Sequence, residues 1–431
     1  MKNIILTLLF LGVISCQEHN NQTPVASTQD YEALMAKAAE PQQNLTQSDI
    51  EFWQNKLKNE PQNITYLSKL ASLYSSQFRV DGNIDHIYKA DSIFELVAER
   101  NPFSNAATFQ ALGVNAITKH EFQKAREYAK SALSEGDQQG ASYNLLFDAS
   151  MEVGDYATAE GILNRYEQKN SFQYLIRASK MADHKGDLDL AIHLMEKAHE
   201  RVKGNENLYL WSKSNLGDMY GHAGRITDSY NAYLDVLNKN VQHWHSWQGL
   251  AWIAYAKDGN VSEARRILKF VDQHHFDPQL KLSLAELADF EGNAEEAQNL
   301  KEEYHQIVSD QKYLAMYNKY LILLEAEDLN YPEVALARAE REKNYRPTPD
   351  MFDLLAWSHL KNGDKQKALE IAQTQVEGKT SEPDVIFHLG MIYLENGESK
   401  KAKTYLNEAL EASYELGPIT TQAVQTALSS L

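Results

Sequence analysis

A small residue recurs at nearly regular intervals along most of this 431-residue chain. The ten positions have a mean spacing of about 35 residues. A unit this short cannot enclose a hydrophobic core alone, so successive units must stack and bury their apolar faces against one another. We therefore expect one continuous array instead of separate compact domains. The recurring positions are Ala90, Ala125, Ala159, Ala191, Ser229, Ala264, Ala297, Ala335, Ala368 and Ala402.

The same local context surrounds most of these small residues. About thirteen residues earlier stands an apolar residue followed by a small one, as in Leu216-Gly217 and Leu389-Gly390. About five residues earlier stands a glycine, such as Gly186 or Gly363, which can take the positive φ that ends one helix and lets the next fold back. Each unit is thus predicted to be a pair of helices whose small residues permit close approach.

Over about residues 47–411 this pattern resembles the tetratricopeptide-repeat family. The resemblance implies an all-α, right-handed superhelical solenoid of about ten helix pairs. It also implies that the first helices of successive units line a concave groove, where a partner's peptide or helix binds. We assign residues 47–417 to the solenoid and residues 418–431 to a carboxyl-terminal capping helix. The unit around Ala335 lacks the turn glycine, and a seven-residue insertion containing residues 81–83 predicts a loop in the first unit.

The amino terminus is typical of a secretion signal. Residues 1–15 combine Lys2 with an apolar run, and they end before Cys16, the only cysteine in the chain. Residues 13–16, Val-Ile-Ser-Cys, resemble the bacterial lipobox, which implies acylation of Cys16. The resemblance implies a lipoprotein of the bacterial cell envelope, anchored in the outer membrane. Residues 16–46 are then a lipidated tether and leading segment, in which the polar residues 17–30 are expected to be flexible.

Charge and motifs narrow the class of function. The chain has 42 Lys and Arg against 60 Asp and Glu, a net charge of −18, which disfavours nucleic acid as a partner because phosphates are repelled. It has no Gly-x-Ser-x-Gly, no His-Glu-x-x-His and no phosphate-binding glycine loop. We therefore expect a non-catalytic scaffold or adaptor without a cofactor, which captures another envelope protein or a peptide segment in its groove.

Counting positions along the first helix of each unit gives candidate groove residues. In the early units these are polar, as at Gln110, Asn144 and Asp148. Farther along, aromatic and acidic side chains gather, which favours a basic or amide-rich partner segment. The alternative is that residues such as Trp252 and Trp357 pack against neighbouring helices inside a tight superhelix. The predicted groove residues are Trp211, Asp218, His245, Gln248, Trp252, Tyr255, Glu286, Asp289, Phe290, Tyr317, Tyr320, Asp350, Asp353 and Trp357.

Two other functions stay open at this point. One is an accessory factor that handles a metal or small ligand for an envelope enzyme through His243, His245, His274 and His275. Neither histidine cluster has the i, i+4 spacing of a helical metal site, so we assign no metal ligand. The other is a structural subunit of an envelope complex, in which the outer face of the solenoid is buried. The sequence specifies neither the partner nor the oligomeric state.

Overall fold

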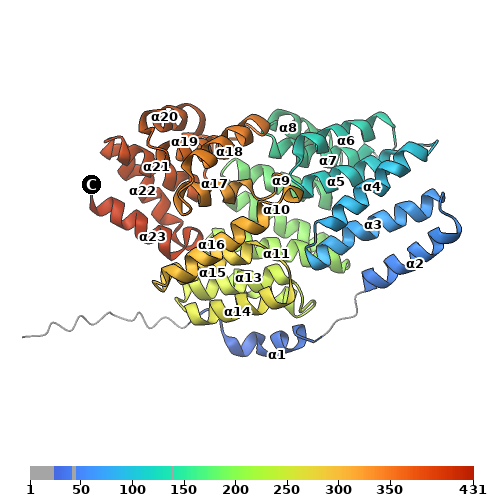
Figure 1. Ribbon diagram of the computed structural model, residues 1–431, viewed down its shortest axis with the longest axis horizontal. Coiled ribbons are helices and arrows are strands. Elements are labelled where there is room, and N and C mark those ends of the chain that lie inside the picture. Colours follow the sequence, from blue (N-terminus) through green and yellow to red (C-terminus); the bar gives the residue numbers. More distant parts are fainter. Residues whose placement is uncertain (1–23, 41–44, 138) are drawn as a thin grey trace, which may run out of the picture.

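All regular structure in the computed structural model is helical (Figure 1). The structure describes residues 24–40, 45–137 and 139–431. Within these ranges it contains 23 α-helices, one short 3₁₀-helix and two π-helical segments, and no strand. None of the helices in the same ranges is long and apolar enough to cross a membrane. The predicted all-α fold is confirmed.

The helices form ten successive pairs, preceded by α1 and α2 and followed by α23. The first helices of the pairs are α3 (Ile64–Asp81), α5 (Ala106–Thr118), α7 (Gln139–Glu152), α9 (Phe172–His184), α11 (Glu206–His222), α13 (Trp244–Trp252), α15 (Gln279–Phe290), α17 (Asn318–Glu327), α19 (Pro349–Lys361) and α21 (Pro383–Glu395). The second helices are α4 (Asp85–Arg100), α6 (Phe122–Ser134), α8 (Tyr156–Arg165), α10 (Leu188–Arg201), α12 (Ile226–Leu237), α14 (Val261–His274), α16 (Ala294–Val308), α18 (Pro332–Tyr345), α20 (Lys365–Ile371) and α22 (Ser399–Glu411). The remaining elements are α1 (Thr28–Ala38), α2 (Leu45–Asn59), α23 (Ser413–Ser429), the 3₁₀-helix η2 (Gln311–Tyr313) and the π-helical segments η1 (Ile253–Lys257) and η3 (Ala372–Val376).

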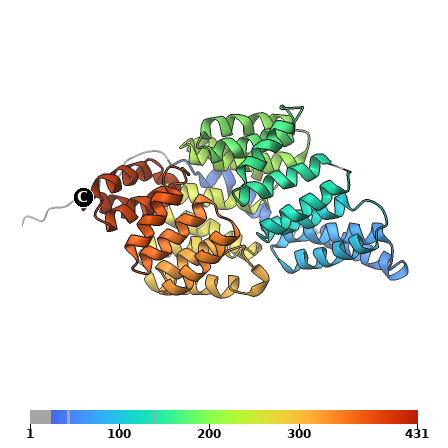
Figure 2. The ribbon, with the colours of Figure 1, turned by 90° about the horizontal axis from the view of Figure 1, so that it is seen from above.

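The pairs follow a curved path and make a superhelical solenoid. Figure 2 shows this path running from the blue amino-terminal pairs, through green and yellow, to the orange and red carboxyl-terminal pairs. The number of pairs agrees with the predicted count of about ten. Because each pair packs mainly on the pairs before and after it in the chain, the core is a series of small apolar clusters along the path.

The recurring small residues lie at the helix-to-helix contacts. All ten are buried, with at most 1% of their surface exposed. The closeness of the packing is clearest around Tyr233, whose ring lies between Gly217 and Gly249. A Cβ atom added to these glycines would lie 2.6 and 2.4 Å from ring atoms of Tyr233, respectively. Small residues are therefore required there because a larger side chain would displace the ring.

The turns within pairs use a left-handed residue even where glycine is missing. Gly154 has a φ of +75°, and in the two turns without glycine His120 and Asn330 take a φ of +56°. One prediction about the turns is wrong. The insertion containing residues 81–83 lengthens α3 to Asp81, after which Gly82 ends the helix at a φ of +70°, so no long loop forms.

The solenoid closes on itself, because pairs about 220 residues apart in the chain are in contact. The Tyr88 hydroxyl donates to the Lys312 carbonyl at 2.7 Å, across a separation of 224 residues. The Gln123 amide donates to the Tyr345 carbonyl at 3.2 Å, across 222 residues. The Arg346 guanidinium lies 5.2 Å from the centre of the Phe122 ring. These contacts join α4 and α6 to elements of the second half, and they cover part of the inner surface.

The leading segment docks on the solenoid instead of extending from it. Residues 24–30 were expected within the flexible tether, but the backbone amides of Val25 and Ala26 donate to the Asp258 carboxylate at 2.9 and 2.8 Å. Helix α1 follows and buries Tyr31 completely in the cluster of α12, α13 and α14. The apolar residues of α1 recur every three to four positions, at Tyr31, Met35 and Ala38, and this apolar face explains the docking, since a helix this short needs tertiary packing to be stable.

Helix α23 begins before the predicted capping segment and consists of two parts. Gly417 has a φ of +75° and a ψ of 169°, which breaks the helical geometry directly before Pro418. The part after Pro418 packs on the last pair through Val424 and Ala427. The part before it, Ser413–Gly417, turns toward the inner side of α11, α13 and α15.

Candidate functional site

The centre of the predicted groove is filled by the chain itself. The indole N–H of Trp252 donates to the Tyr414 carbonyl at 3.1 Å. A Cβ atom on Gly417 would lie 2.8 Å from the Trp252 ring and 2.9 Å from Glu286 Oε1. Burial and the neighbouring Asp289 carboxylate raise the pKa of Glu286 to about 7. The segment 413–417 therefore occupies the place where a partner was expected.

Three predicted groove residues are buried in the structure. Tyr255, Asp353 and Trp357 each expose only 2% of their surface. The Trp357 ring stacks on His388 at 4.0 Å, and its indole N–H donates to Glu327 Oε1 at 2.6 Å. These contacts join neighbouring first helices, so Trp357 packs inside the superhelix, as the alternative interpretation had it. None of the three lines an open groove.

The other predicted residues lie along the inner side without forming one cluster. Phe290 and Tyr320 remain 44% and 38% exposed, and Tyr317 is half-buried against Tyr304. Four of the predicted polar residues, Asp218, His245, Gln248 and Asp289, make hydrogen bonds or ion pairs with neighbouring side chains. The pairs are His245 Nε2 with Asp218 Oδ1 at 2.8 Å, Gln248 Nε2 with Asp277 Oδ2 at 3.1 Å, and Lys301 Nζ with Asp289 Oδ2 at 2.7 Å. Asp350 lies apart from them, in a cavity described below.

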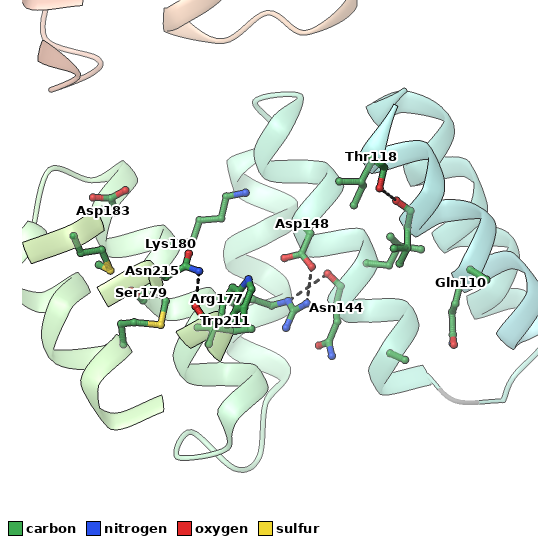
Figure 3. A pocket seen from close by; sticks show the side chains of 18 of the residues that line it. Gln110, Thr118, Asn144, Asp148, Arg177, Ser179, Lys180, Asp183, Trp211 and Asn215 are labelled. Carbon is green, nitrogen blue, oxygen red and sulfur yellow. Dashed lines mark hydrogen bonds and ion pairs between the residues drawn. The ribbon is translucent and has the colours of Figure 1, made fainter. Parts of the chain in front are cut away.

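An open cavity lies on the inner side of the earlier pairs, across α5, α7, α9 and α11 (Figure 3). Its volume is about 930 Å³, which is within the range of ligand sites. Val114 and Trp211 line it and remain 53% and 41% exposed, respectively. We call it the apolar cavity, after its apolar lining residues Val114, Ile117, Leu145, Ile176, Met195, Trp211 and Met219.

A few charged groups stand among these apolar side chains. The Arg177 guanidinium pairs with Asp148 at 2.5 Å and donates to Gln173 Oε1 at 2.7 Å. Figure 3 shows this pair in the middle of the cavity, with Gln110 toward one end and Asp183 toward the other. Asp183 has no ion-pair partner among the described residues, and burial raises its pKa. The cavity thus combines an apolar surface with a carboxylate at one end.

Sequence reasoning identified only part of this cavity. Trp211 is the one predicted anchor that lines it, although the polar positions Gln110, Asn144 and Asp148 line it too. The count that gave those polar residues also gives Val114 and Ile117. Neither is aromatic or charged, so neither is among the predicted groove residues. An aliphatic residue directly after the Leu-Gly pair, at a position predicted to face the groove, is the sequence signal that indicates this cavity.

The histidines considered for metal binding make other contacts. His243 Nδ1 lies 3.0 Å from the Ser246 hydroxyl, and burial lowers the His243 pKa to about 4. His274 Nδ1 lies 2.7 Å from the Phe270 carbonyl, and His275 stacks on Trp244. Within the described ranges, no group of three or more His, Cys, Asp or Glu residues is placed to hold a metal ion.

Comparisons with known proteins bear on the repeat. Residues 383–415, which contain α21 and α22, match the family model of the tetratricopeptide repeat. No curated protein matches the chain.

The solved structures that align with the chain have low similarity. A tetratricopeptide repeat protein from Parabacteroides merdae is 16% identical over 60% of this chain and 97% of that one, with a TM-score of 0.34. The APC/C hetero-tetramer Cut9–Hcn1 is 12% identical over 93% and 89%, with a TM-score of 0.43. YrrB, a tetratricopeptide protein with an unusual peptide-binding site, is 15% identical over 45% and 95%, with a TM-score of 0.28. These scores are too low for any of the likenesses to extend to function.

The whole solenoid thus consists of helix pairs with buried small residues at their contacts. One of these pairs, residues 383–415, matches the family model of a known repeat. Proteins with this repeat typically act as interaction scaffolds and are typically not enzymes. The chain is a helical-repeat protein whose last pair, residues 383–415, matches the tetratricopeptide repeat.

Proposed function

We propose that this protein is a non-catalytic interaction scaffold of the bacterial cell envelope, anchored in the outer membrane by lipid at Cys16. Its apolar cavity captures a segment of another envelope protein. The observation that supports capture is the exposure of Val114 and Trp211 on a concave surface, at 53% and 41%. Apolar side chains gathered in a concavity are typical of binding sites because a partner can bury them.

The lining also restricts the chemistry of the partner segment. The apolar cavity needs apolar side chains to fill it, and Trp211 offers a rigid anchor at low entropic cost. Asp148 is already paired with Arg177, whereas Asp183 is unpaired at the end of the cavity. A segment with apolar residues next to basic or amide side chains fits this arrangement, and the net charge of −18 favours its approach.

Val114→Glu is expected to weaken partner binding at least about tenfold, because it places a charge in the apolar floor of the cavity. Trp211→Ala is expected to weaken binding by a similar factor through loss of the anchor. Both effects are measured on an array of overlapping peptides from envelope proteins. The unaltered purified chain identifies the peptides that bind, and each variant is then compared with it on those peptides.

Phe103→Ala is the matched control for these variants. Phe103 is 83% exposed and lies between α4 and α5, outside the cavity. Its loss should leave binding of the same peptides unchanged. If the two cavity variants bind those peptides as the unaltered chain does, while their circular dichroism stays helical, the apolar cavity is not the capture site.

Cys16 lies outside the described residues, so its lipidation rests on the sequence. Cys16→Ser is expected to abolish incorporation of a labelled fatty acid and to shift the full-length chain from the detergent phase to the aqueous phase. The reason is that acyl chains supply the anchoring energy, at about 0.8 kcal/mol per buried methylene. Ser15→Ala keeps the thiol and serves as the control. A chain that stays unlabelled with Cys16 intact contradicts the lipid anchor.

A further inference from the structure

Two polar cavities continue the inner surface beyond the apolar cavity. The first has a volume of about 330 Å³ and lies where α9 and α11 meet the elements from α19 to α23. Asp183 lines this cavity and also lines the apolar cavity, so the two adjoin. The second is smaller, about 50 Å³, and shares Asp350 and Glu382 with the first. The three cavities thus adjoin in series, and their lining changes from apolar to acidic.

Carboxylates dominate the lining of the two polar cavities. Six carboxylates line the two cavities, together with two lysines, Lys319 and Lys379, and three histidines. We call the two polar cavities together the acidic recess, defined by Asp183, Asp350, Asp353, Glu382, Asp384 and Glu415. Its charge is opposite to that of a basic ligand.

One carboxylate in the recess is buried and incompletely satisfied. Asp353 exposes only 2% of its surface and lines the smaller cavity. Its Oδ2 atom lies 2.7 Å from His388 Nδ1, but its Oδ1 atom has no hydrogen-bond partner in the part of the chain that the structure describes. A buried carboxylate oxygen without a donor is costly, and a donor that enters the smaller cavity would remove that cost.

The surrounding charges are also poorly neutralised. The Lys319 ammonium is 3.7 Å from Asp384, a long ion pair, and no described cation lies within ion-pair distance of Glu382. Burial raises the pKa of Glu382, and the nearby Asp350 and Glu415 carboxylates raise it further. Burial likewise raises the pKa of Asp353, although His388 opposes this. Lys319 and His388 line the smaller cavity and offset part of the repulsion among these carboxylates.

We propose that the acidic recess binds a primary ammonium group, with Asp353, Asp350 and Glu382 as its acceptors. The group is the side chain of a lysine that follows apolar residues in the captured segment, so this inference rests on the proposed function. An ammonium has three donors, which suits several carboxylates around a small space. The smaller cavity, at about 50 Å³, is large enough to admit an ammonium group, which is similar in size to a water. A planar guanidinium is larger, so lysine is preferred to arginine.

The test uses small probes, so that it does not depend on the apolar cavity. Nα-acetyl-lysine methylamide is titrated into the purified soluble chain at low ionic strength, and the methyl NMR signals of Met351 and Val385, which line the smaller cavity, are followed. We expect saturable shifts that weaken as salt is added. The norleucine analogue, which lacks the ammonium, should give no saturable shift, and the arginine analogue should bind at least about tenfold more weakly.

Variants at the rim of the acidic recess are not expected to disturb the fold, so they test ammonium binding itself. Glu382→Gln and Asp350→Asn are each expected to weaken the lysine probe about tenfold, because each removes a charged acceptor. Asp353→Asn should do the same, but it also breaks the pair with His388, so the rim variants carry the test. Glu411→Gln, an exposed carboxylate on α22, is the matched control and should leave binding unchanged.

Two further probes separate the sources of the ammonium. A peptide with apolar residues before its lysine should bind at least about tenfold more tightly than the single lysine derivative if both cavities are used. Val114→Glu should remove only that gain, so failure of the apolar cavity shows separately from failure of the recess.

Equal binding of cadaverine and the lysine peptide would mean that the recess takes free amines. Methyl shifts that are absent, or equal for the lysine and norleucine probes, would mean that the recess holds water only, and would overturn the proposal.

Discussion

Arg338→Ala should lower the free energy of unfolding by about 3–5 kcal/mol, the loss typical of breaking a buried ion pair from one side. Glu325 on α17 is completely buried. Arg338 on α18 donates to it through Nη2 at 2.7 Å and through Nε at 3.0 Å. Without the guanidinium, the carboxylate stays buried with only His305, at 3.2 Å, beside it. Urea denaturation followed by circular dichroism measures the loss.

The control for this prediction replaces both partners. Glu325→Leu combined with Arg338→Met leaves no buried charge, so the double variant should recover most of the lost stability. A loss below about 1 kcal/mol in Arg338→Ala would contradict the prediction, because that value is typical of an exposed pair. The pair of α17 and α18 is also one of the two units whose turns lack glycine, and this ion pair joins its two helices across their interface.

Repeat spacing predicted the solenoid because the contacts that define it are local in sequence. Each small residue, such as Ala264 or Ala402, needs only the partner helix of its own pair and the next pair along the chain, so a pattern of about 35 residues carries the information. The same locality explains why the turns were predictable. Asn330 and His120 show the limit of that rule, since they adopt the left-handed conformation that glycine usually takes.

The open part of the inner surface could not be predicted in the same way. It depends on contacts between segments about 160 to 220 residues apart, such as Trp252 with Tyr414 and Gln123 with Tyr345. No periodic pattern encodes which pairs meet when the solenoid closes. Sequence reasoning therefore found residues on the inner side, such as Trp357, without showing that neighbours cover them. The aliphatic floor around Val114 is open because no distant segment among the described residues covers it.

The docking of α1 is a second contact that the repeat pattern does not encode. Tyr31 is fully buried, its ring meets Trp247 edge-on at 6.0 Å, and its hydroxyl donates to Glu263 Oε1 at 2.8 Å. Glu32 adds an ion pair with Arg266 at 3.0 Å. The bonds from residues 25–27, further hydrogen bonds at Asp30 and Ala38, and the packing of Met35 also hold this segment on the solenoid.

Tyr31→Ala is expected to release α1 from the solenoid, because removing a large buried aromatic side chain costs about 3–5 kcal/mol. An isolated helix of 11 residues is marginal in water, so release also unfolds α1. Hydrogen exchange should then show loss of protection in residues 28–38, with the protection of α13 and α14 largely retained.

Tyr31→Phe is the control, since it removes only the hydroxyl and should weaken docking by about 1 kcal/mol. If the amides of α1 stay protected in Tyr31→Ala, the contacts of residues 25–27 hold the segment without the aromatic ring. In the proposed lipid-anchored protein the docked α1 has a direct consequence. Val25, nine residues after Cys16 in the sequence, is held against the solenoid with α1, so release of α1 should let the solenoid, and its apolar cavity, reach partners farther from the membrane.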